Sequence, residues 1–280
     1  RVKLPFKVVI NWIPRDLVFS AGVIFPSTIN IYSGSFKDFG VRLFIHELVH
    51  IFANELMGVA NSERTRFFEE MFADGIASLY LTDDKLAVRS HYQTWLTFKV
   101  DSNLRRISLL EMMIGKPESM GNTPLETLFF ANSLGAFIGK TYGSKGLMQL
   151  YLSIPSQREI QTSSWAVANS TINTAISGSL GASTHDLEMK WWEYLNDFAL
   201  QRKLSLYEEL FSLYYFNIHK PLIATGRISG LLYEGLIDER ILDQIRELLN
   251  ELENRILSGV GPDIIEIDHY KIRVQELTIN

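Results

Sequence analysis

The residues of this chain best suited to chemistry lie together in one short stretch, His46-Glu47-Leu48-Val49-His50. On a helix, residues four positions apart share a face, so the two imidazole rings can bind one metal ion. A glutamate beside the first histidine can act as a base on a water molecule at that metal. The pattern therefore predicts one Zn²⁺ ion per chain, with His46 and His50 as ligands and Glu47 as the general base of a hydrolysis.

The helix that must carry these residues is apolar. Apolar side chains recur at helical spacing from residue 39 to residue 57, and Gly58 follows where a helix-ending glycine is expected. Two histidines and a glutamate buried in such a helix cost several kcal/mol if nothing pairs them. A pair of ordinary core histidines is the alternative interpretation, and this cost argues against it.

A third ligand is expected from a second helix, which the apolar pattern places at residues 67–80. Residues 59–62 are typical of a turn, so this helix should run antiparallel to the first. At a rise of about 1.5 Å per residue, it reaches the level of His50 near Glu69 and Glu70. One of these two carboxylates is therefore the expected third ligand.

The choice between the two glutamates follows from their neighbours. Glu69 and Glu70 point in directions about 100° apart around the helix, so only one of them can face the metal. Glu70 has Asp74 one turn further along its own face, whereas the residue one turn after Glu69 is Ala73. We expect Glu70 to be the ligand and Glu69 to be a solvated carboxylate. We expect Asp74 to accept a hydrogen bond from His46 and to fix the tautomer of its ring.

With these residues placed, the chain resembles the gluzincins, zinc peptidases in which HExxH is followed by a glutamate on the next helix. Residues 70–74, Glu-Met-Phe-Ala-Asp, are similar to the E-x-x-A-D segment of several such families. Residues 74–80 also resemble the E-G-x-A-x-Y segment of aminopeptidase-N-like enzymes and of bacterial peptidase-MA-like proteins, and in that alignment Asp74 itself would bind zinc. The resemblance implies a zincin-like fold and the hydrolysis of a peptide or protein substrate.

The resemblance extends downstream of the motif, so that it covers residues 1 to about 200. Residues 129–143 resemble the helix that follows the site in peptidase-MA-like proteins, and residues 175–195 resemble their closing helix. In aminopeptidase-N-like enzymes, a tyrosine at the position of Phe129 donates a hydrogen bond to the tetrahedral oxyanion. A phenyl ring cannot do this, and the loss of one such donor costs about 10²–10³ in rate.

Phe129 therefore leaves two functions open. Tyr142 is a candidate for the missing oxyanion donor, as are Tyr92 and His91, although aromatic residues on apolar helix faces usually belong to the core. With a replacement donor, the chain would be a zinc-dependent peptidase. Without one, it would be a zincin-fold binding or scaffold domain that keeps the metal site but hydrolyses little.

The residues before the motif are typical of a small β-sheet, residues 1–36. Three runs rich in apolar and β-branched residues, at 2–10, 18–25 and 29–34, are separated by segments that contain proline. The gluzincins have an edge strand just before the active-site helix that pairs with an extended substrate, and the resemblance assigns this role to residues 28–33. The expected fold is thus α+β.

Beyond the second helix, the period of the apolar residues predicts a mainly helical chain, with helices at 86–98, 107–114, 125–142 and 187–198. Residues 153–183 are rich in Ser, Thr and Asn, so we expect this part to be the loosest, with only 167–176 forming a short helix. The expected organisation is a zincin-like metallopeptidase domain at 1–200, divided into the sheet 1–36, the active-site helices 38–82 and a helical subdomain 83–200.

The remaining residues, 201–280, are expected to form a mainly helical C-terminal extension. Residues 241–257 have the pattern of an amphipathic helix, and the chain from residue 262 alternates like a strand. One interpretation is an appendage that packs on the catalytic domain. The breadth of the apolar stripe favours a second interpretation, self-association through these C-terminal helices.

Composition limits the partners. Of the 280 residues, 46% are hydrophobic, which is ample for a core. The formal net charge is −5, so nucleic acid is not an expected partner. There is no cysteine, so the metal ligands must be histidines and carboxylates. Charged residues interrupt every long apolar stretch, so no membrane span is expected. The chain starts at Arg1 rather than Met, which suggests export or secretion after removal of a signal segment, and a cytoplasmic location stays open.

Overall fold

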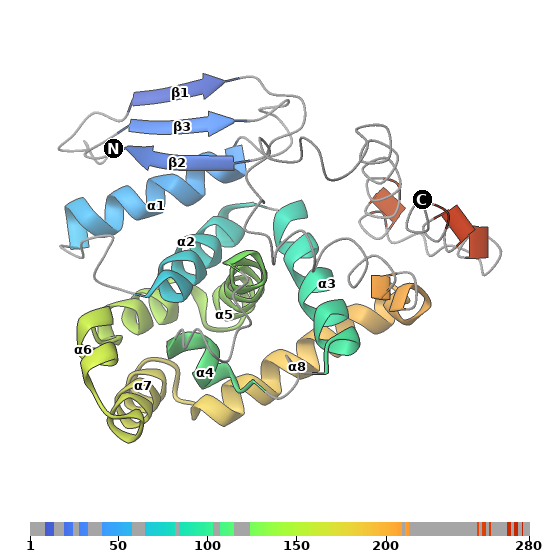
Figure 1. The fold of residues 1–280 in the computed structure, drawn as a ribbon. Helices are drawn as coiled ribbons and strands as arrows, with labels where there is room; N and C mark the ends of the chain where they lie inside the picture. Colours follow the sequence, from blue (N-terminus) through green and yellow to red (C-terminus); the bar gives the residue numbers. More distant parts are fainter. Residues whose placement is uncertain are drawn as a thin grey trace.

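The structure, a computed structural model, places a small β-sheet against one helix and a larger group of helices beyond it (Figure 1). It describes residues 9–13, 20–24, 28–32, 41–57, 65–81, 84–102, 107–114, 124–208 and 211–212, with isolated positions between 251 and 276. The fold is α+β, as expected from the sequence.

Three strands form the sheet in the order β1-β3-β2. They are β1 (Val9–Ile13), β2 (Ser20–Ile24) and β3 (Thr28–Tyr32). β1 runs parallel to β3, with Asn11 opposite Asn30, and the amide of Asn11 donates to the side-chain oxygen of Asn30 over 2.9 Å. The prediction of three strands is confirmed, although β1 extends to Ile13, and residues 2–8 of the expected first strand lie outside the described part.

The expected position of the edge strand is wrong. β3 pairs on both sides, with β1 and with the antiparallel β2, and is therefore the central strand. Among the described strands, β2 is the edge strand that packs on the first helix (Figure 1). Alternation along a strand shows which side chains share a face, but it does not show which strand pairs with which.

Helix α1 (Val41–Met57) carries the HExxH stretch, and α2 (Arg66–Tyr80) runs antiparallel beside it. Both helices agree with the sequence prediction to within two residues. α1 lies between the sheet and the remaining helices, with β2 and β3 on one side and α2 on the other (Figure 1). This position explains why its polar residues are buried.

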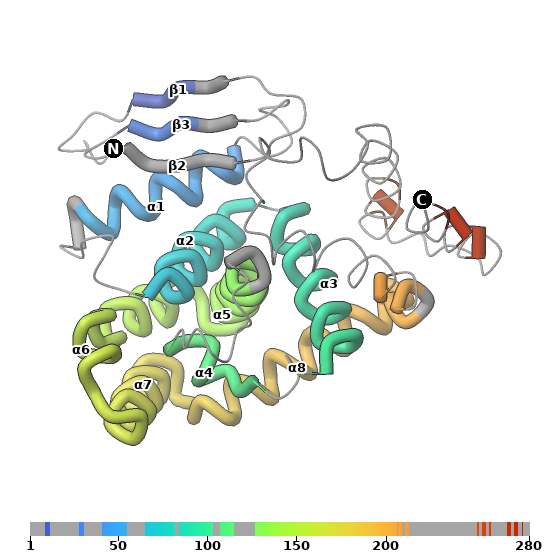
Figure 2. Tube along the Cα trace, viewed as in Figure 1, coloured from blue at the N-terminus to red at the C-terminus, as the bar shows by residue number. Residues whose placement is uncertain are grey.

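The other helices surround α2 and close the core. They are α3 (Lys85–Val100), α4 (Leu109–Ile114), α5 (Pro124–Ser153), α6 (Gln157–Thr162), α7 (Trp165–Leu180), α8 (Thr184–Gln201) and the short 3-10 helix η3 (Leu204–Tyr207). α5 is kinked at Gly143, whose φ of 71° is a conformation that favours glycine. Figure 2 follows the chain from α5 through α6 and α7 into α8, which returns beside α3 and α4.

The expectation that residues 153–183 form the loosest part is wrong, because α6 and α7 occupy most of this segment. Three of the serines that suggested a loop are helix N-caps: Ser156, Ser164 and Ser183. Ser156 forms a capping box with Glu159, and the Ser164 side chain accepts a hydrogen bond from the backbone N–H of Val167. The helices are held by apolar residues on their inner faces, which include Ile160 and Ile172.

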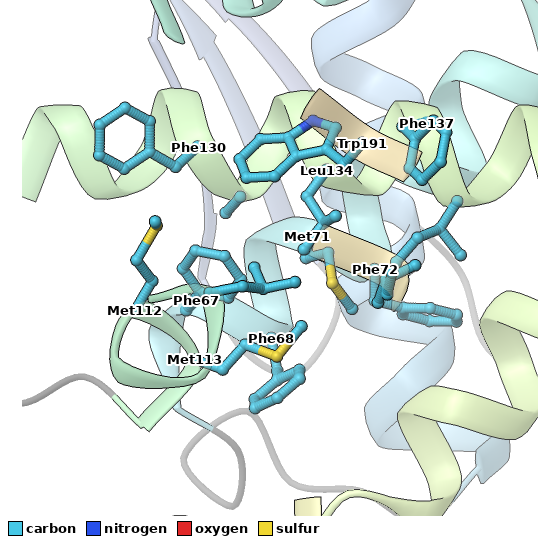
Figure 3. Packing of buried hydrophobic residues seen from close by; sticks show 14 of the residues in the cluster. Phe67, Phe68, Met71, Phe72, Met112, Met113, Phe130, Leu134, Phe137 and Trp191 are labelled. Atoms are coloured by element: carbon cyan, nitrogen blue, oxygen red, sulfur yellow. The ribbon is translucent and has the colours of Figure 1, made fainter. Parts of the chain in front are cut away.

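The hydrophobic core is built around α2. Figure 3 shows the core side chains of α2 against those of α4, α5 and α8; labelled are Phe67, Phe68, Met71, Phe72, Met112, Met113, Phe130, Leu134, Phe137 and Trp191. α2 and α5 are so close that a Cβ atom on Gly135 would lie 2.1 Å from the backbone oxygen of Met71. This contact holds one face of α2 against α5 and leaves another face for α1.

The core continues past α8, because Leu204, Tyr207 and Phe211 are buried in it. The amphipathic helix expected at 241–257 and the strand expected from 262 lie outside the described residues, apart from isolated positions. Among the helices that the structure describes, none is both long enough and apolar enough to cross a membrane.

Candidate metal centre

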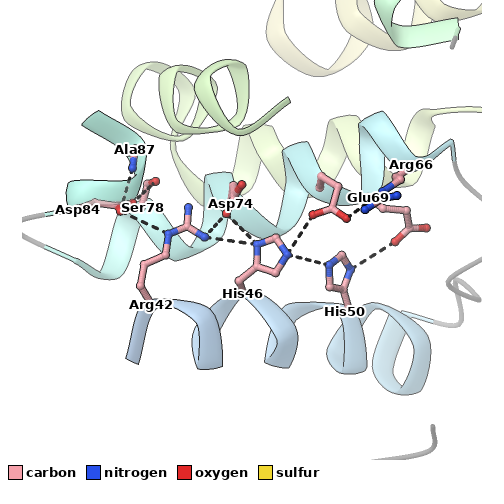
Figure 4. A network of polar contacts seen from close by, with 10 residues as sticks. Arg42, His46, His50, Arg66, Glu69, Asp74, Ser78, Asp84 and Ala87 are labelled. Atoms are coloured by element: carbon pink, nitrogen blue, oxygen red, sulfur yellow. Dashed lines mark hydrogen bonds and ion pairs between the residues drawn. The ribbon is translucent and has the colours of Figure 1, made fainter. Parts of the chain in front are cut away.

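Two histidines from α1 and one glutamate from α2 present their ligand atoms to one another (Figure 4). The Nε2 atom of His46 lies 3.2 Å from Nε2 of His50 and 3.1 Å from Oε2 of Glu70. Ligands about 2.0–2.1 Å from a tetrahedral zinc ion stand about 3.3 Å apart, so these separations fit such an ion. The group His46, His50 and Glu70 could therefore hold a metal ion.

The second ring nitrogen of His46 is held by Asp74. Nδ1 lies 2.8 Å from Oδ1 of Asp74, whose side chain is fully buried. A carboxylate in this position accepts a hydrogen bond from the N–H at Nδ1 and leaves the Nε2 lone pair for a metal. Asp74 thus lies on the side of the ring away from Glu70, which fits an orienting role and contradicts the alternative alignment in which Asp74 is itself a ligand.

Glu69 is buried, which contradicts the expectation that it is solvated. Only 6% of the residue is exposed, and one of its carboxylate oxygens lies 3.6 Å from Nδ1 of His50. Neither oxygen has a hydrogen-bond partner within the described part of the chain. Because α1 packs across a wide face of α2, it covers both glutamates: Glu70 faces the metal-binding nitrogen atoms, and Glu69 faces the far side of the second histidine ring.

Glu47 follows His46 on α1 and is 7% exposed. Burial raises the pKa of its carboxyl above the usual range, and the neighbouring His46 and His50 reduce this shift. A carboxylate with a raised pKa is a stronger base than one in water. The environment of Glu47 is therefore suited to accepting a proton.

The side chains around His46 favour a positive charge at the candidate metal site. Burial lowers the pKa of His46, but Asp74 and Glu70 outweigh this effect and raise it from 6.5 to about 10. Burial raises the pKa of Glu70, and its hydrogen bond and charge contact with His46 reverse this and lower it. The proton that His46 holds between the two carboxylates carries a positive charge where a metal ion could bind. Metal binding at such a site releases a proton.

Arg42 is a component of the site that the sequence analysis missed. It lies one turn before His46 on α1, is 5% exposed, and its Nη1 atom forms an ion pair with Oδ1 of Asp74 (Figure 4). Burial raises the pKa of Asp74, but Arg42 and His46 outweigh this and lower it. The signal was an arginine in an otherwise apolar helix, on the same face as the two histidines.

The candidate oxyanion donors lie in the core. His91 is buried, with Nδ1 3.0 Å from the Ser133 hydroxyl and Nε2 3.2 Å from the Tyr194 hydroxyl. Both ring nitrogens are therefore engaged in structural contacts, which contradicts a catalytic role. Tyr92 is also buried in the core. Tyr142 packs against the core beside Gly146, its hydroxyl has no hydrogen-bond partner among the described residues, and its role as a donor stays a prediction.

Comparison of the chain with protein-family models, with curated proteins and with solved structures found no match. What can be inferred about function therefore rests on the site itself.

Proposed function

We propose that the protein is a zinc-dependent peptidase of the gluzincin type, with a zincin-like fold. The observation that carries the proposal is the group of ligand atoms around His46. Its Nε2 atom lies 3.2 Å from Nε2 of His50 and 3.1 Å from Oε2 of Glu70, and the buried Glu47 is next to it in the chain. A zinc ion at this position would act as a Lewis acid and lower the pKa of water.

In the proposed reaction, the Glu47 carboxylate takes a proton from the water molecule that attacks the peptide carbonyl. It later delivers this proton to the leaving amine. Its burial, which raises its pKa, supports both steps because the group must accept and then release a proton near neutral pH. His46, His50 and Glu70 hold the metal, and Asp74 orients His46.

The substrate we propose is an extended peptide. β2 is paired on one side only among the described strands, and it packs on α1, which carries the motif (Figure 1). The free edge of a strand offers backbone N–H and C=O groups that can pair with another chain. This arrangement supports an endo- or exopeptidase that binds the substrate backbone along β2.

A second candidate is a zincin-fold binding or scaffold domain with a metal site and little hydrolysis. The observation that favours it concerns oxyanion stabilisation. Phe129 has no donor, and the two ring nitrogens of His91 are engaged with Ser133 and Tyr194. Unless Tyr142 or a backbone group donates instead, hydrolysis would be slowed by about 10²–10³.

Zinc content and peptide cleavage, measured on the same preparations, test the proposal. We expect near-stoichiometric zinc in the wild type, loss of zinc in His50→Ala and Glu70→Ala, and chelator-sensitive cleavage of a peptide library. Glu47→Gln should keep zinc and lose about 10²–10⁴ in rate. Glu193→Gln, which changes an exposed glutamate on α8, is the matched control and should keep both properties.

The outcomes separate the two candidates. Bound zinc without cleavage would favour the binding domain. Full cleavage by Glu47→Gln would show that another group is the base. A wild-type protein that binds no zinc would end the metal proposal altogether.

A further inference from the structure

The guanidinium group of Arg42 is held between two buried aspartates (Figure 4). Its Nη1 atom contacts Oδ1 of Asp74, the same oxygen that accepts from Nδ1 of His46. Its Nε atom lies 3.4 Å from Oδ1 of Asp84. One side chain thus links the metal-binding helix to both of the following helices.

We propose that Arg42 is a positioning residue for the metal centre. It holds Asp74 in the orientation in which Oδ1 accepts from Nδ1 of His46, and this contact directs Nε2 toward the metal. The inference rests on the proposed metal site and adds a residue to it. The Nη1 atom of Arg42 also lies 3.4 Å from Nδ1 of His46, but a nitrogen that donates its proton to Asp74 cannot accept one from Arg42. Arg42 does not touch Nε2, so it acts through Asp74.

The surroundings of Asp74 explain why a cation is needed there. The Asp74 side chain is completely buried, and its Oδ2 atom has no hydrogen-bond partner in the described part of the chain. A buried carboxylate without a cation is strongly disfavoured. Without Arg42, His46 would be the remaining contact of the Asp74 carboxylate within the described part of the chain, and nothing else there would keep Oδ1 turned toward Nδ1.

Arg42 is itself held in place by Asp84. This aspartate begins α3, accepts from the backbone N–H of Ala87 over 3.1 Å, and accepts from the Ser78 hydroxyl over 2.6 Å. Because Asp84 is anchored to two helices, it fixes the position of the guanidinium group. A lysine at position 42 has a single ammonium group, so it can neutralise Asp74 but cannot bind both aspartates through separate nitrogens.

The test is the affinity for Zn²⁺, measured by competition with a chelator of known affinity on protein shown to be folded by circular dichroism. Loss of a residue that supports a metal ligand lowers metal affinity by about 10–100-fold. We expect a loss in this range for Arg42→Met and a smaller loss for Arg42→Lys. Arg158→Met, which removes an exposed arginine of α6, should bind zinc as the wild type does.

A double substitution distinguishes positioning from general stability. If Arg42 acts through Asp74, then Arg42→Met combined with Asp74→Asn should bind zinc no more weakly than Asp74→Asn alone. If the double variant lost zinc affinity by the product of the two single losses, the inference would be overturned. Unchanged zinc affinity in folded Arg42→Met would also overturn it. If Arg42→Met does not fold, the test uses the double variant Arg42→Lys with Asp84→Asn. A zinc affinity equal to that of the wild type in this double variant would overturn the inference. Failure of the wild type to bind zinc would instead refute the proposed function.

Discussion

At the level of single residues, each histidine of the metal centre has a buried carboxylate beside its Nδ1 atom, Asp74 for His46 and Glu69 for His50. The two pairs differ in their support. Asp74 is 2.8 Å from its histidine and is paired with Arg42, whereas Glu69 is 3.6 Å away and its oxygens have no hydrogen-bond partner among the described residues. When a metal binds Nε2 of His50, the proton on Nδ1 needs an acceptor, and Glu69 is placed to provide it.

Replacing Glu69 should therefore change metal binding and stability in opposite directions. Glu69→Leu should weaken zinc binding by about 10-fold, because His50 loses its acceptor. The free energy of unfolding of the metal-free protein should rise by about 1 kcal/mol, because a buried carboxylate without a hydrogen bond is removed. Chelator competition and urea unfolding measure the two effects. Glu69→Gln keeps an acceptor and should lose less affinity, and equal losses in both variants would contradict the proposed contact.

At the level of helices, the position of α2 determines which of its faces meets the histidines. Close backbone packing on α5 at Gly75 and Gly135 holds α2 on one side, and α1 covers another side. This arrangement brings Glu70 and Asp74 to His46. A shift of α2 should thus disturb the metal centre as well as the core.

Substituting Gly135 tests this packing. A Cβ atom there would lie 2.1 Å from the Met71 backbone oxygen, which cannot move out of the way as a side chain can. We expect Gly135→Ala to lower the free energy of unfolding by about 3 kcal/mol in urea titrations, and to weaken zinc binding. In Gly178→Ala the new methyl group meets nothing within 4 Å. This matched change within α7 should be neutral or stabilise by up to about 1 kcal/mol, and similar results for both variants would argue against close packing.

At the level of the whole molecule, a buried polar network joins α3, α5 and α8. His91 of α3 contacts Ser133 and Tyr194, and the indole N–H of Trp191 donates to the same serine over 3.2 Å. Burial, together with the charges of Lys140 and Arg202, lowers the pKa of His91 from 6.5 to about 3. The folded protein therefore keeps this ring neutral in mildly acidic solution.

This network predicts a loss of stability in acid. Between pH 6.5 and pH 3 the unfolded chain binds a proton at His91 and the folded protein does not, so stability falls as the pH falls. Between pH 8 and pH 5 the contribution of His91 is about 2 kcal/mol. The raised pKa of His46 contributes in the opposite direction and equally in every variant, so the test is a difference between variants. In urea unfolding with a chelator present, the change in stability between pH 8 and pH 5 should be less favourable by about 2 kcal/mol in the wild type and in the control Tyr92→Phe than in His91→Gln. The same pH dependence in all three proteins would contradict it.

The parts of the site that depend on local geometry could be predicted from the amino-acid sequence. The spacing of His46 and His50 places both rings on one helix face, and the rise per residue brings Glu70 to their level on an antiparallel helix. Asp74 follows one turn later and meets His46, as expected. These relations need only the period of a helix and a short connection, which is why sequence periodicity could predict them.

Packing between distant elements sets which neighbours cover each residue, and the sequence pattern does not show this. It buried Glu69, paired Arg42 with Asp74 and Asp84, engaged His91 in the core, and made β2 the edge strand. It also turned the serine-rich stretch at 153–183 into capped helices. Each outcome depends on packing between elements far apart in the chain. The free energy of burying a charged or polar side chain is unfavourable without partners and can be favourable with them.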